Sequence, residues 1–426
     1  FGGLVVAWAG VVGLGDMRTI LALILACTFE PTLSAQDPTI RPFRIEVAEK
    51  ALADLHPRLS ATRWPDQIPN TKWQYGTDLA TLRDLVHYWE EGYNWRAREK
   101  RLNTLSQFKT VLDGIDLHFV HVRSPHSKAT PLVLVHGWPG SAFEFQKIIP
   151  MLTQPEKHGG KAADAFHVVC PSLPGFAFSS APVEPGWSND HSAEVVAKLM
   201  ARLDYEKYLA QGGDWGASIV RWLADHDGAH CLGAHSNMPM AGRPGNDPWK
   251  NVSREERNRW EQRNAELRPH KAYMNLQGTR PLTLGYGLND SPVGLAAWIL
   301  DKFWAWSDHR GDLQNSFSKD ELVDNIMIYW ISGSMPSAMR IYYETFNRQP
   351  RPKSMSPFLK SGPPAPLGFA LFPKEINVPP RAWVQRQFGK RMVHWSEMLR
   401  GGHFAALETP ELLAKDIRAF FAKIRP

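Results

Sequence analysis

Cysteine is scarce in this chain, since only Cys27, Cys170 and Cys231 occur among 426 residues. They form neither a C-x-x-C pair nor an even framework, so we expect neither a disulfide scaffold nor a thiolate zinc site. Runs of like charge are also missing, and 49 Lys+Arg against 43 Asp+Glu leave a formal net charge of +6. We therefore expect no nucleic-acid-binding surface.

Long apolar runs are confined to the N-terminal end. Residues 1–15 are apolar and glycine-rich, and residues 17–35 combine one positive residue, a short apolar run and a small-residue site. This order is typical of a secretory signal segment, so we set residues 1–36 apart and expect a secreted or periplasmic protein. A membrane anchor made of both apolar runs, and a cytoplasmic location, stay open. After Gln36 no stretch approaches 18 apolar residues, so we expect a soluble body.

Aromatic residues are plentiful, with 17 Trp, 20 Phe and 10 Tyr. A chain of this length can bury a large core, and so many tryptophans also indicate an apolar ligand pocket. Residues 37–107 form a first region with helical spacing, because Leu52, Leu55 and Leu59 recur at three- and four-residue intervals. We expect two or three helices in this region.

After residue 107 the pattern changes from helical spacing to strands. Two apolar stretches within 108–122, separated by Asp113-Gly114, predict a β-hairpin. Short apolar runs then alternate with helical patterns, the first of which begins at Ser141, and this alternation predicts an open parallel α/β sheet. The apolar runs are 131–135, 166–170, 208–211 and 231–235.

Residues 238–364 lack strand-like runs and are rich in Trp and Tyr, which predicts a mostly helical insertion. Strand-like runs return at 368–372 and 392–395, and an amphipathic helix ends the chain. The predicted fold class is therefore α/β, with a core in two parts, 108–237 and 365–426, separated by a helical cap.

The segment Gly212-Gly213-Asp214-Trp215-Gly216 directly follows one of the predicted strands. Glycines two residues before and after the centre allow the tight strand-to-helix turn that lifts the central side chain into a cleft. Serine or cysteine usually occupies this centre, whereas this chain has Asp214 and no Gly-x-Ser-x-Gly anywhere. A carboxylate suits displacement at saturated carbon and forms an alkyl ester. The alternative is an ordinary turn in which Asp214 caps the helix.

An ester on Asp214 needs a base for its hydrolysis, and His403 follows the final strand-like run. Glu375 follows the penultimate run and can orient the imidazole and stabilise its cationic form. The order Asp214, Glu375, His403 is the nucleophile–acid–base order of the α/β-hydrolase fold. A loop histidine alone carries little weight, but three such residues, each just past a strand end, favour a catalytic triad.

The loop after the run 131–135 reads His136-Gly137-Trp138-Pro139-Gly140. In the α/β-hydrolase fold this loop supplies one oxyanion-hole N–H, and the residue after the nucleophile supplies the other. We therefore assign the oxyanion hole to the backbone of Trp138 and Trp215, whose side chains would also contact substrate. Trp138–Pro139 is a candidate for a cis peptide bond.

These motifs resemble those of the epoxide hydrolases of the microsomal and juvenile-hormone type. The segments 136–141, 213–216 and 402–406 look like the core motifs of that family, and residues 95–119 are similar to its N-terminal domain. The resemblance runs from about Pro42 to the C-terminus. It implies an α/β-hydrolase fold with a mostly parallel sheet, a helical cap over 238–364 and an N-terminal helical extension.

The resemblance also implies two cap tyrosines that hold the epoxide oxygen and donate a proton as the C–O bond breaks. The segments 273–281 and 340–344 look like their sites, which gives this role to Tyr273 and Tyr342. Tyr343 stays open as an alternative to Tyr342, and either residue could instead be a packed aromatic.

The implied reaction converts an apolar epoxide and water to a vicinal diol. Asp214 forms the ester, a water activated by His403 and Glu375 hydrolyses it, and neither a cofactor nor a metal is needed. Detoxification and the catabolism of aromatic or terpenoid compounds both fit this reaction. The sequence leaves open the particular epoxide, its enantiomer, the attacked carbon and the oligomeric state, and only the N-terminal segment suggests membrane contact.

Two alternative functions stay open at this point. A haloalkane dehalogenase uses the same aspartate ester but holds a halide with Trp or amide N–H groups and needs no tyrosine pair. A catalytically inactive α/β-hydrolase could serve as a binding protein, although such proteins usually lose a triad member. A serine esterase is disfavoured because no serine occupies the strand-to-helix turn.

Overall fold

The computed structural model describes residues 39–347 and 362–425. The signal-like segment predicted for residues 1–36 lies outside this part of the chain, as does Cys27. Cys170 and Cys231 are buried free thiols. Across the described ranges, no helix is both long enough and apolar enough to cross a membrane.

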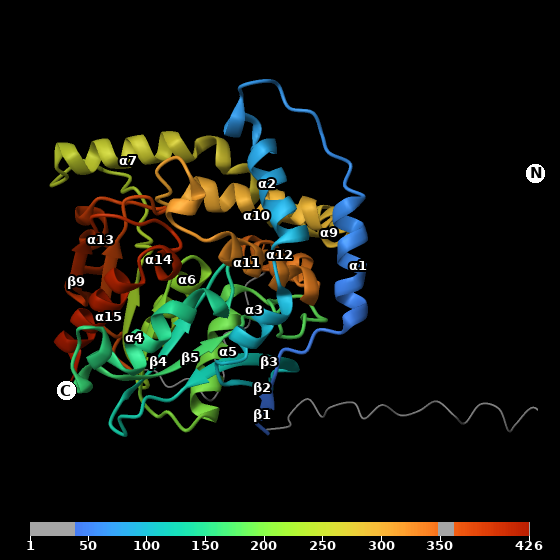
Figure 1. Ribbon diagram of the computed structural model, residues 1–426. Helices are drawn as coiled ribbons and strands as arrows, with labels where there is room; N and C mark the ends of the chain where they lie inside the picture. Colours follow the sequence, from blue (N-terminus) through green and yellow to red (C-terminus); the bar gives the residue numbers. More distant parts are fainter. Residues whose placement is uncertain (1–38, 348–361, 426) are drawn as a thin grey trace, which may run out of the picture.

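The described residues form one nine-stranded sheet at the centre of the molecule (Figure 1). The strand order is β1-β2-β3-β5-β4-β6-β7-β8-β9. Pairing is antiparallel from β1 to β5 and parallel from β5 to β9. The strands are β1 Arg41–Phe43, β2 Gln107–Leu112, β3 Ile115–Val122, β4 Thr130–Val135, β5 Phe166–Pro171, β6 Tyr208–Gly212, β7 Cys231–Ser236, β8 Leu367–Leu371 and β9 Met392–Glu397.

The predicted hairpin is strands β2 and β3, joined at Asp113 and Gly114. Both turn residues have positive φ, 50° and 80°, as the tightest hairpin turns require. The short strand β1 adds to the outer edge of this hairpin and pairs with β2. The sequence did not predict β1, because three residues are too few to show an alternating pattern.

Helices cover both faces of the parallel part of the sheet. α5 Asn189–Arg202 and α6 Trp215–His226 pack together on one face, and α4 Ile148–Thr153 and α15 Pro410–Ile424 pack together on the other. The predicted helix at Ser141 differs in detail. Ser141 caps a 3₁₀ helix over Ala142–Lys147, and regular α-helix begins only at Ile148.

The helical insertion stands over the carboxyl ends of the parallel strands (Figure 1). Its helices are α7 Arg254–Leu267, α8 Ala272–Thr279, α9 Pro281–Asp290, α10 Pro292–Trp306, α11 Lys319–Ser332 and α12 Met335–Phe346. α13 Arg381–Phe388 and α14 Ala405–Glu408 belong to the returning core.

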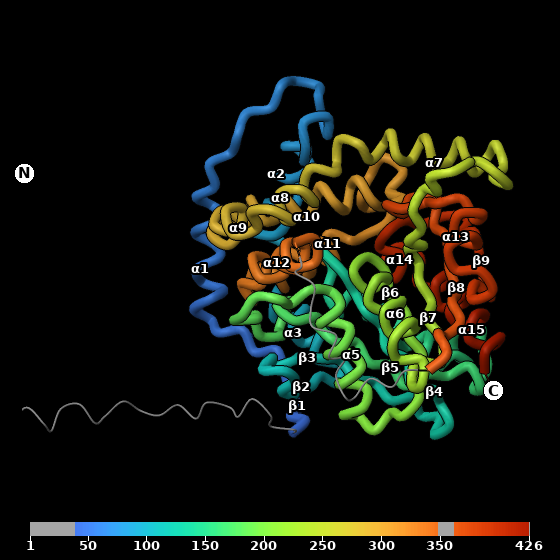
Figure 2. The backbone as a smooth tube through the Cα atoms, turned by 180° about the vertical axis from the view of Figure 1, so that it is seen from behind, coloured from blue at the N-terminus to red at the C-terminus, as the bar shows by residue number. Residues whose placement is uncertain are grey.

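The N-terminal helices lie against this cap. They are α1 Glu49–Ser60, α2 Leu79–Glu91 and α3 Trp95–Leu102, in agreement with the expected two or three. α1 contacts α10, and α2 contacts both α10 and α11. Figure 2 shows the same arrangement from behind, with α1 running along the outer side of the cap.

Candidate active site

The candidate site lies at the point where the strand order reverses. The chain leaves β4 for β5 on one side and later returns to β6 on the other, and Val135 of β4 is paired with Gly212 of β6. The loops after β4 and β6 therefore begin side by side at one edge of the sheet. In open α/β sheets this crevice is the usual ligand site.

Asp214 sits at the sharp turn between β6 and α6 with a φ of 51°, a conformation that non-glycine residues seldom adopt. Gly216 makes the turn possible, because a Cβ there would lie 1.9 Å from the carbonyl oxygen of Val135. Asp214 stands at the N-cap position of α6, but its side chain makes no helix-capping hydrogen bond.

The Asp214 carboxylate instead faces the loop after β4. Its Oδ1 accepts a hydrogen bond of 2.8 Å from the backbone N–H of Trp138. Burial raises the pKa of Asp214, while His403 and the backbone N–H groups of Trp138 and Trp215 act in the opposite direction. Gly137 must be a glycine, since a Cβ there would lie 2.2 Å from Oδ1. The Trp138–Pro139 peptide bond is cis, as predicted.

His403 lies between the two candidate carboxylates. Its Nδ1 is 2.6 Å from Oε1 of Glu375, and its Nε2 is 3.6 Å from Oδ2 of Asp214. Burial lowers the pKa of His403, but the charge and hydrogen bond of Glu375 and the charge of Asp214 raise it to about 9. The structure thus brings together the three residues that the sequence predicted, in the geometry of a triad.

The loops that carry Glu375 and His403 are held by the cap. The Arg263 guanidinium donates hydrogen bonds to the backbone oxygens of Glu375, Lys374 and Ala305. The backbone N–H of His403 donates to the oxygen of Trp306 at 2.8 Å. No pattern in the sequence pointed to Arg263, because one arginine of a polar helix looks like any other.

Tyr273 of α8 and Tyr342 of α12 meet above Asp214. Their ring centroids are 5.9 Å apart, their hydroxyls interact, and burial together with the charge of Asp214 raises the pKa of each. Tyr342 is 2% exposed, whereas Tyr343 is 43% exposed on the outer side of the helix. The geometry therefore favours Tyr342 over Tyr343 as the second hydroxyl of the site.

An apolar pocket of about 440 Å³ opens above the carboxylate and the two tyrosines. Its volume is in the range of pockets for small organic ligands. Most of its lining is apolar or aromatic, and this lining includes Trp215, Met238, Leu267, Met274, Trp306 and Phe346. The pocket matches the expectation drawn from the many tryptophans.

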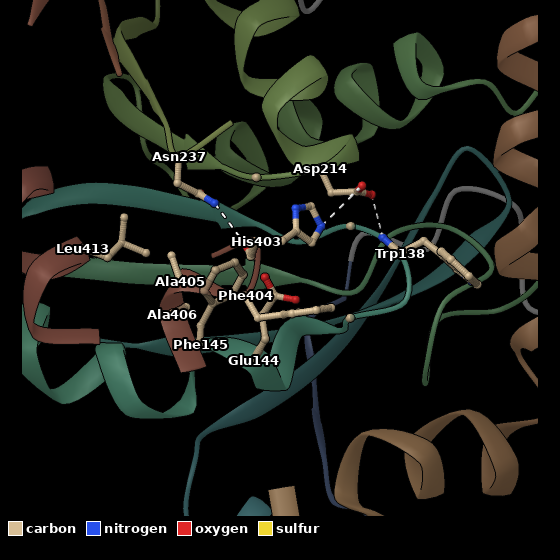
Figure 3. A pocket seen from close by; sticks show the side chains of 13 residues that line it. Trp138, Glu144, Phe145, Asp214, Asn237, His403, Phe404, Ala405, Ala406 and Leu413 are labelled. Carbon is tan, nitrogen blue, oxygen red and sulfur yellow. Dashed lines mark hydrogen bonds and ion pairs between the residues drawn. The ribbon is translucent and has the colours of Figure 1, made fainter. Parts of the chain in front are cut away.

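A second, much smaller cavity of about 10 Å³ also reaches Asp214. Glu144, Asp214, His403 and Asn237 line it, and Figure 3 shows the Glu144 carboxylate turned toward the imidazole. Burial raises the pKa of Glu144 to about 8, so this side chain is neutral at pH 7. Sequence reasoning missed Glu144, although Ser141-Ala-Phe-Glu144 has the spacing of a capping box.

One group within the described ranges has the spacing of metal ligands: His235, His394 and Asp416. Both imidazoles already lie 2.9 Å from the Asp416 carboxylate, one at each oxygen. The Lys423 ammonium lies 2.8 Å from His394, and its positive charge opposes cation binding. The group is a hydrogen-bonded link between β7, β9 and α15.

The arrangement brings together a buried carboxylate, an imidazole bonded to a second carboxylate, the backbone N–H groups of Trp138 and Trp215, and two phenolic hydroxyls. Trp215 lines the pocket and its indole N–H has no hydrogen-bond partner among the residues that the structure describes, so one donor for a halide is present. Tyr273 and Tyr342 add two hydroxyls that can give a proton to an oxygen leaving group, which a halide does not need. The chemistry of the side chains therefore favours a substrate with an oxygen leaving group.

Two family descriptions match the chain: "Epoxide hydrolase N terminus" at residues 40–145 and "alpha/beta hydrolase fold" at residues 130–269. A putative epoxide hydrolase of Stigmatella aurantiaca is 44% identical over 91% of this chain and 86% of its own length. Epoxide hydrolase 1 of Oryctolagus cuniculus is 39% identical, with coverage of 90% and 89%.

Solved structures agree with these relatives. The juvenile hormone epoxide hydrolase of the silkworm Bombyx mori superposes with a TM-score of 0.81 at 33% identity, covering 92% of this chain and 96% of that one. The Aspergillus niger epoxide hydrolase gives 0.79 at 30% identity, with coverage of 92% and 99%. These matches confirm the α/β-hydrolase fold that the order of the motifs predicted.

Proposed function

Because this chain belongs to the epoxide hydrolase family, enzymes that add water to an epoxide, we propose that its reaction runs through an alkyl ester on Asp214. The observation that carries the proposal is the meeting of this carboxylate with His403 and with Tyr273 and Tyr342 at one apolar pocket. The apolar lining fits a small apolar epoxide.

In the first half of the reaction, Asp214 attacks a ring carbon of the epoxide. The ring C–O bond breaks, the new ester C–O bond forms, and the epoxide oxygen takes a proton from a tyrosine hydroxyl. Tyr273 and Tyr342 are suited to this step because both residues line the pocket and burial keeps their hydroxyls protonated. The negative charge of Asp214 passes to the phenol oxygen.

In the second half, water attacks the carbonyl carbon of the Asp214 ester. His403 accepts a proton from this water, and Glu375 orients the imidazole and stabilises the imidazolium. The oxyanion forms beside the backbone N–H groups of Trp138 and Trp215. The tetrahedral intermediate then collapses: the bond between the ester carbonyl carbon and the alkoxy oxygen breaks, and the imidazolium of His403 protonates the leaving alkoxide to give the diol. The Asp214 carboxyl, which keeps the oxygen and one proton of the water, returns that proton to the phenolate.

The small cavity beside the triad is the site we assign to the attacking water. About 10 Å³ is close to the space that a single water molecule needs. Glu144, neutral at pH 7, can donate a hydrogen bond to this water while His403 accepts one. The water then lies against the Asp214 carboxyl, which also lines this cavity.

The experiment is turnover of a panel of aryl and alkyl epoxides, followed by diol formation, for the wild type and Asp214→Ala. A haloalkane and a p-nitrophenyl ester serve as control substrates. We expect diol from the wild type and none from the variant. In ¹⁸O-water, the first turnover should label Asp214 and leave the diol unlabelled, and ¹⁸O should appear in the diol only in later turnovers.

Label that appears directly in the diol in the first turnover would contradict the ester mechanism, because water would then attack the epoxide itself. Halide release without diol formation would instead identify a dehalogenase. A folded wild type that acts on none of these substrates would favour the binding-protein alternative.

A further inference from the structure

Lys302 of α10 is a buried cation packed against one of the two proposed proton donors. Its ammonium lies 4.8 Å from the ring centroid of Tyr273, and the residue is 3% exposed. The rings of Trp298 and Trp306 lie 5.2 and 5.9 Å from the same nitrogen. Among the cations that the structure describes, Lys302 is the one that lies over the Tyr273 ring.

Such a burial has a free-energy cost, because a lysine this deep loses most of its hydration. Asp301 offsets part of the cost through an ion pair of 2.5 Å. Asp301 could be paired equally well by an exposed lysine, so the ion pair alone does not require an ammonium among three aromatic rings. The position of the charge over Tyr273 therefore calls for a separate explanation.

The proposed reaction explains a cation at this position, because it moves a negative charge from Asp214 to a tyrosine oxygen. Before attack, the charge is on Asp214, which faces His403 and the Trp138 N–H. After attack, Asp214 is a neutral ester and the charge is on a tyrosine oxygen inside an apolar pocket. A fixed positive charge beside that ring stabilises the phenolate more than the neutral phenol, and the low local dielectric strengthens the effect.

We propose that Lys302 is a positioning residue for the proton transfer, whose ammonium stabilises the phenolate form of Tyr273 while the Asp214 ester forms. This inference rests on the proposed role of Tyr273. It assigns no contact between Lys302 and the substrate. Burial and the charge of Asp214 both raise the pKa of Tyr273, so a compensating cation improves this residue as an acid.

The test is a double-mutant cycle on the alkylation step. The ester-forming rate is measured in single turnovers, through the fluorescence of the tryptophans that line the pocket, for Lys302→Met, Tyr273→Phe and the double variant. We expect Lys302→Met to lower this rate about tenfold with little change in KM. In the Tyr273→Phe background the same substitution should have no further effect, because no phenolate forms at position 273.

Lys319 provides a matched control. Its ammonium lies 5.5 Å from the ring centroid of Tyr88 and 2.7 Å from Asp84, so it repeats the Lys–Tyr–Asp arrangement outside the pocket. Lys319→Met should leave the ester-forming rate unchanged. Lys302→Arg should restore most of the rate, because it keeps the charge, whereas Lys302→Gln should behave like Lys302→Met. The Arg and Gln pair tests the proposal even where Lys302→Met fails to fold.

Two results would overturn the inference while leaving the proposed function intact. One is an equal fall in the ester-forming rate when Lys302→Met is made in the wild type and in Tyr273→Phe, which would show a structural role for Lys302. The other is no loss from Lys302→Met or Lys302→Gln. An unchanged rate in Tyr273→Phe itself would instead contradict the role of Tyr273 in the proposed function.

Discussion

At the scale of single residues, the protonation of His403 depends on the negative charges of Asp214 and Glu375 beside it. With a pKa of about 9, His403 is an imidazolium at neutral pH in the free protein, paired with Asp214 and Glu375. A protonated His403 cannot accept a proton from water. In the proposed reaction, formation of the ester removes the charge of Asp214, which is one of the causes of the raised pKa of His403. The pKa of His403 then falls, and the neutral imidazole can accept a proton from water.

The pH dependence of ester hydrolysis should follow from this change. The rate should rise with pH as His403 loses its proton, with a midpoint below 9 because the Asp214 charge is absent in the ester. Glu375→Gln removes a further cause of the raised pKa and should move the midpoint to lower pH. It should also lower the plateau roughly 100-fold, since the imidazolium loses its carboxylate.

Decay of the ester in single turnovers at several pH values measures both quantities. A midpoint that stays in place in Glu375→Gln would show that Glu375 does not control the protonation of His403. The plateau rate at high pH is measured separately from the midpoint, so a general loss of activity is not mistaken for a change in the pKa of His403.

Adjacent tyrosines offer a matched pair of substitutions. Tyr342→Phe should lower the rate of ester formation about tenfold or more, because one of two hydrogen bonds to the epoxide oxygen is lost. Tyr343→Phe should leave it within twofold, since that side chain is 43% exposed on the far side of α12. The rates of ester formation are measured in single turnovers of one epoxide. A larger fall in this rate for Tyr343→Phe than for Tyr342→Phe would assign the second hydroxyl to Tyr343.

At the scale of elements, α7 connects the cap to the loop that carries Glu375. Arg263 makes three hydrogen bonds to backbone oxygens, two of them on Lys374 and Glu375. Arg263→Leu leaves these oxygens without their donors, and we expect the free energy of unfolding to fall by about 2–4 kcal/mol. We also expect kcat to fall more than KM changes, because Glu375 becomes less well oriented.

Arg259 is the control, one turn earlier on α7. It pairs with Glu397 at the surface, at 2.8 Å, and a surface ion pair contributes at most about 1 kcal/mol. Denaturant unfolding and steady-state kinetics of Arg259→Leu and Arg263→Leu therefore form one experiment. Equal losses of unfolding free energy and of kcat in the two variants would show that the hydrogen bonds of Arg263 to the Glu375 loop contribute no more than a surface ion pair.

The same elements show how far the sequence alone could lead. The strands, and the meeting of Asp214, Glu375 and His403, could be predicted. Buried parallel strands are continuous apolar runs, and ligand sites of α/β sheets lie at the carboxyl ends of the strands. β1 is too short for a pattern, and the helix at Ser141 begins as a 3₁₀ turn. Glu144, Arg263 and Lys302 act through neighbours far away in the chain, so their importance appears only after the chain has folded.

At the scale of the whole molecule, the N-terminal helices and the active site share one helix of the cap. Arg98 of α3 binds Asp324 of α11 through two nitrogens, at 2.9 and 2.5 Å. The next residue, Asn325, donates a hydrogen bond to the oxygen of Pro139, and Tyr329 donates to that of Gly140. α11 thus connects the N-terminal region, which we propose to be residues 37–107, to the oxyanion-hole loop.

This connection predicts a specific pattern of stability. Arg98→Leu leaves the buried Asp324 carboxylate without its cation, and we expect a loss of about 3–5 kcal/mol in the free energy of unfolding. The double variant Arg98→Leu/Asp324→Leu should recover most of it, because no unpaired charge is then buried. Arg58→Leu, which breaks the exposed pairs of α1 with Asp54 and Asp290, should lower the Tm far less.

Thermal unfolding of the three variants, with diol formation measured at a temperature where each is folded, distinguishes two roles of the N-terminal region. If it acts as a brace for the cap, Arg98→Leu lowers Tm and also lowers kcat through the oxyanion-hole loop, and the double variant restores both. The double variant also removes the acceptor of the Tyr93 hydroxyl. Recovery of Tm without recovery of kcat would therefore show that the hydrogen bonds to Asp324, from Arg98 and Tyr93 together, set the position of α11 over the loop. Full activity in Arg98→Leu would contradict any coupling between the N-terminal helices and catalysis.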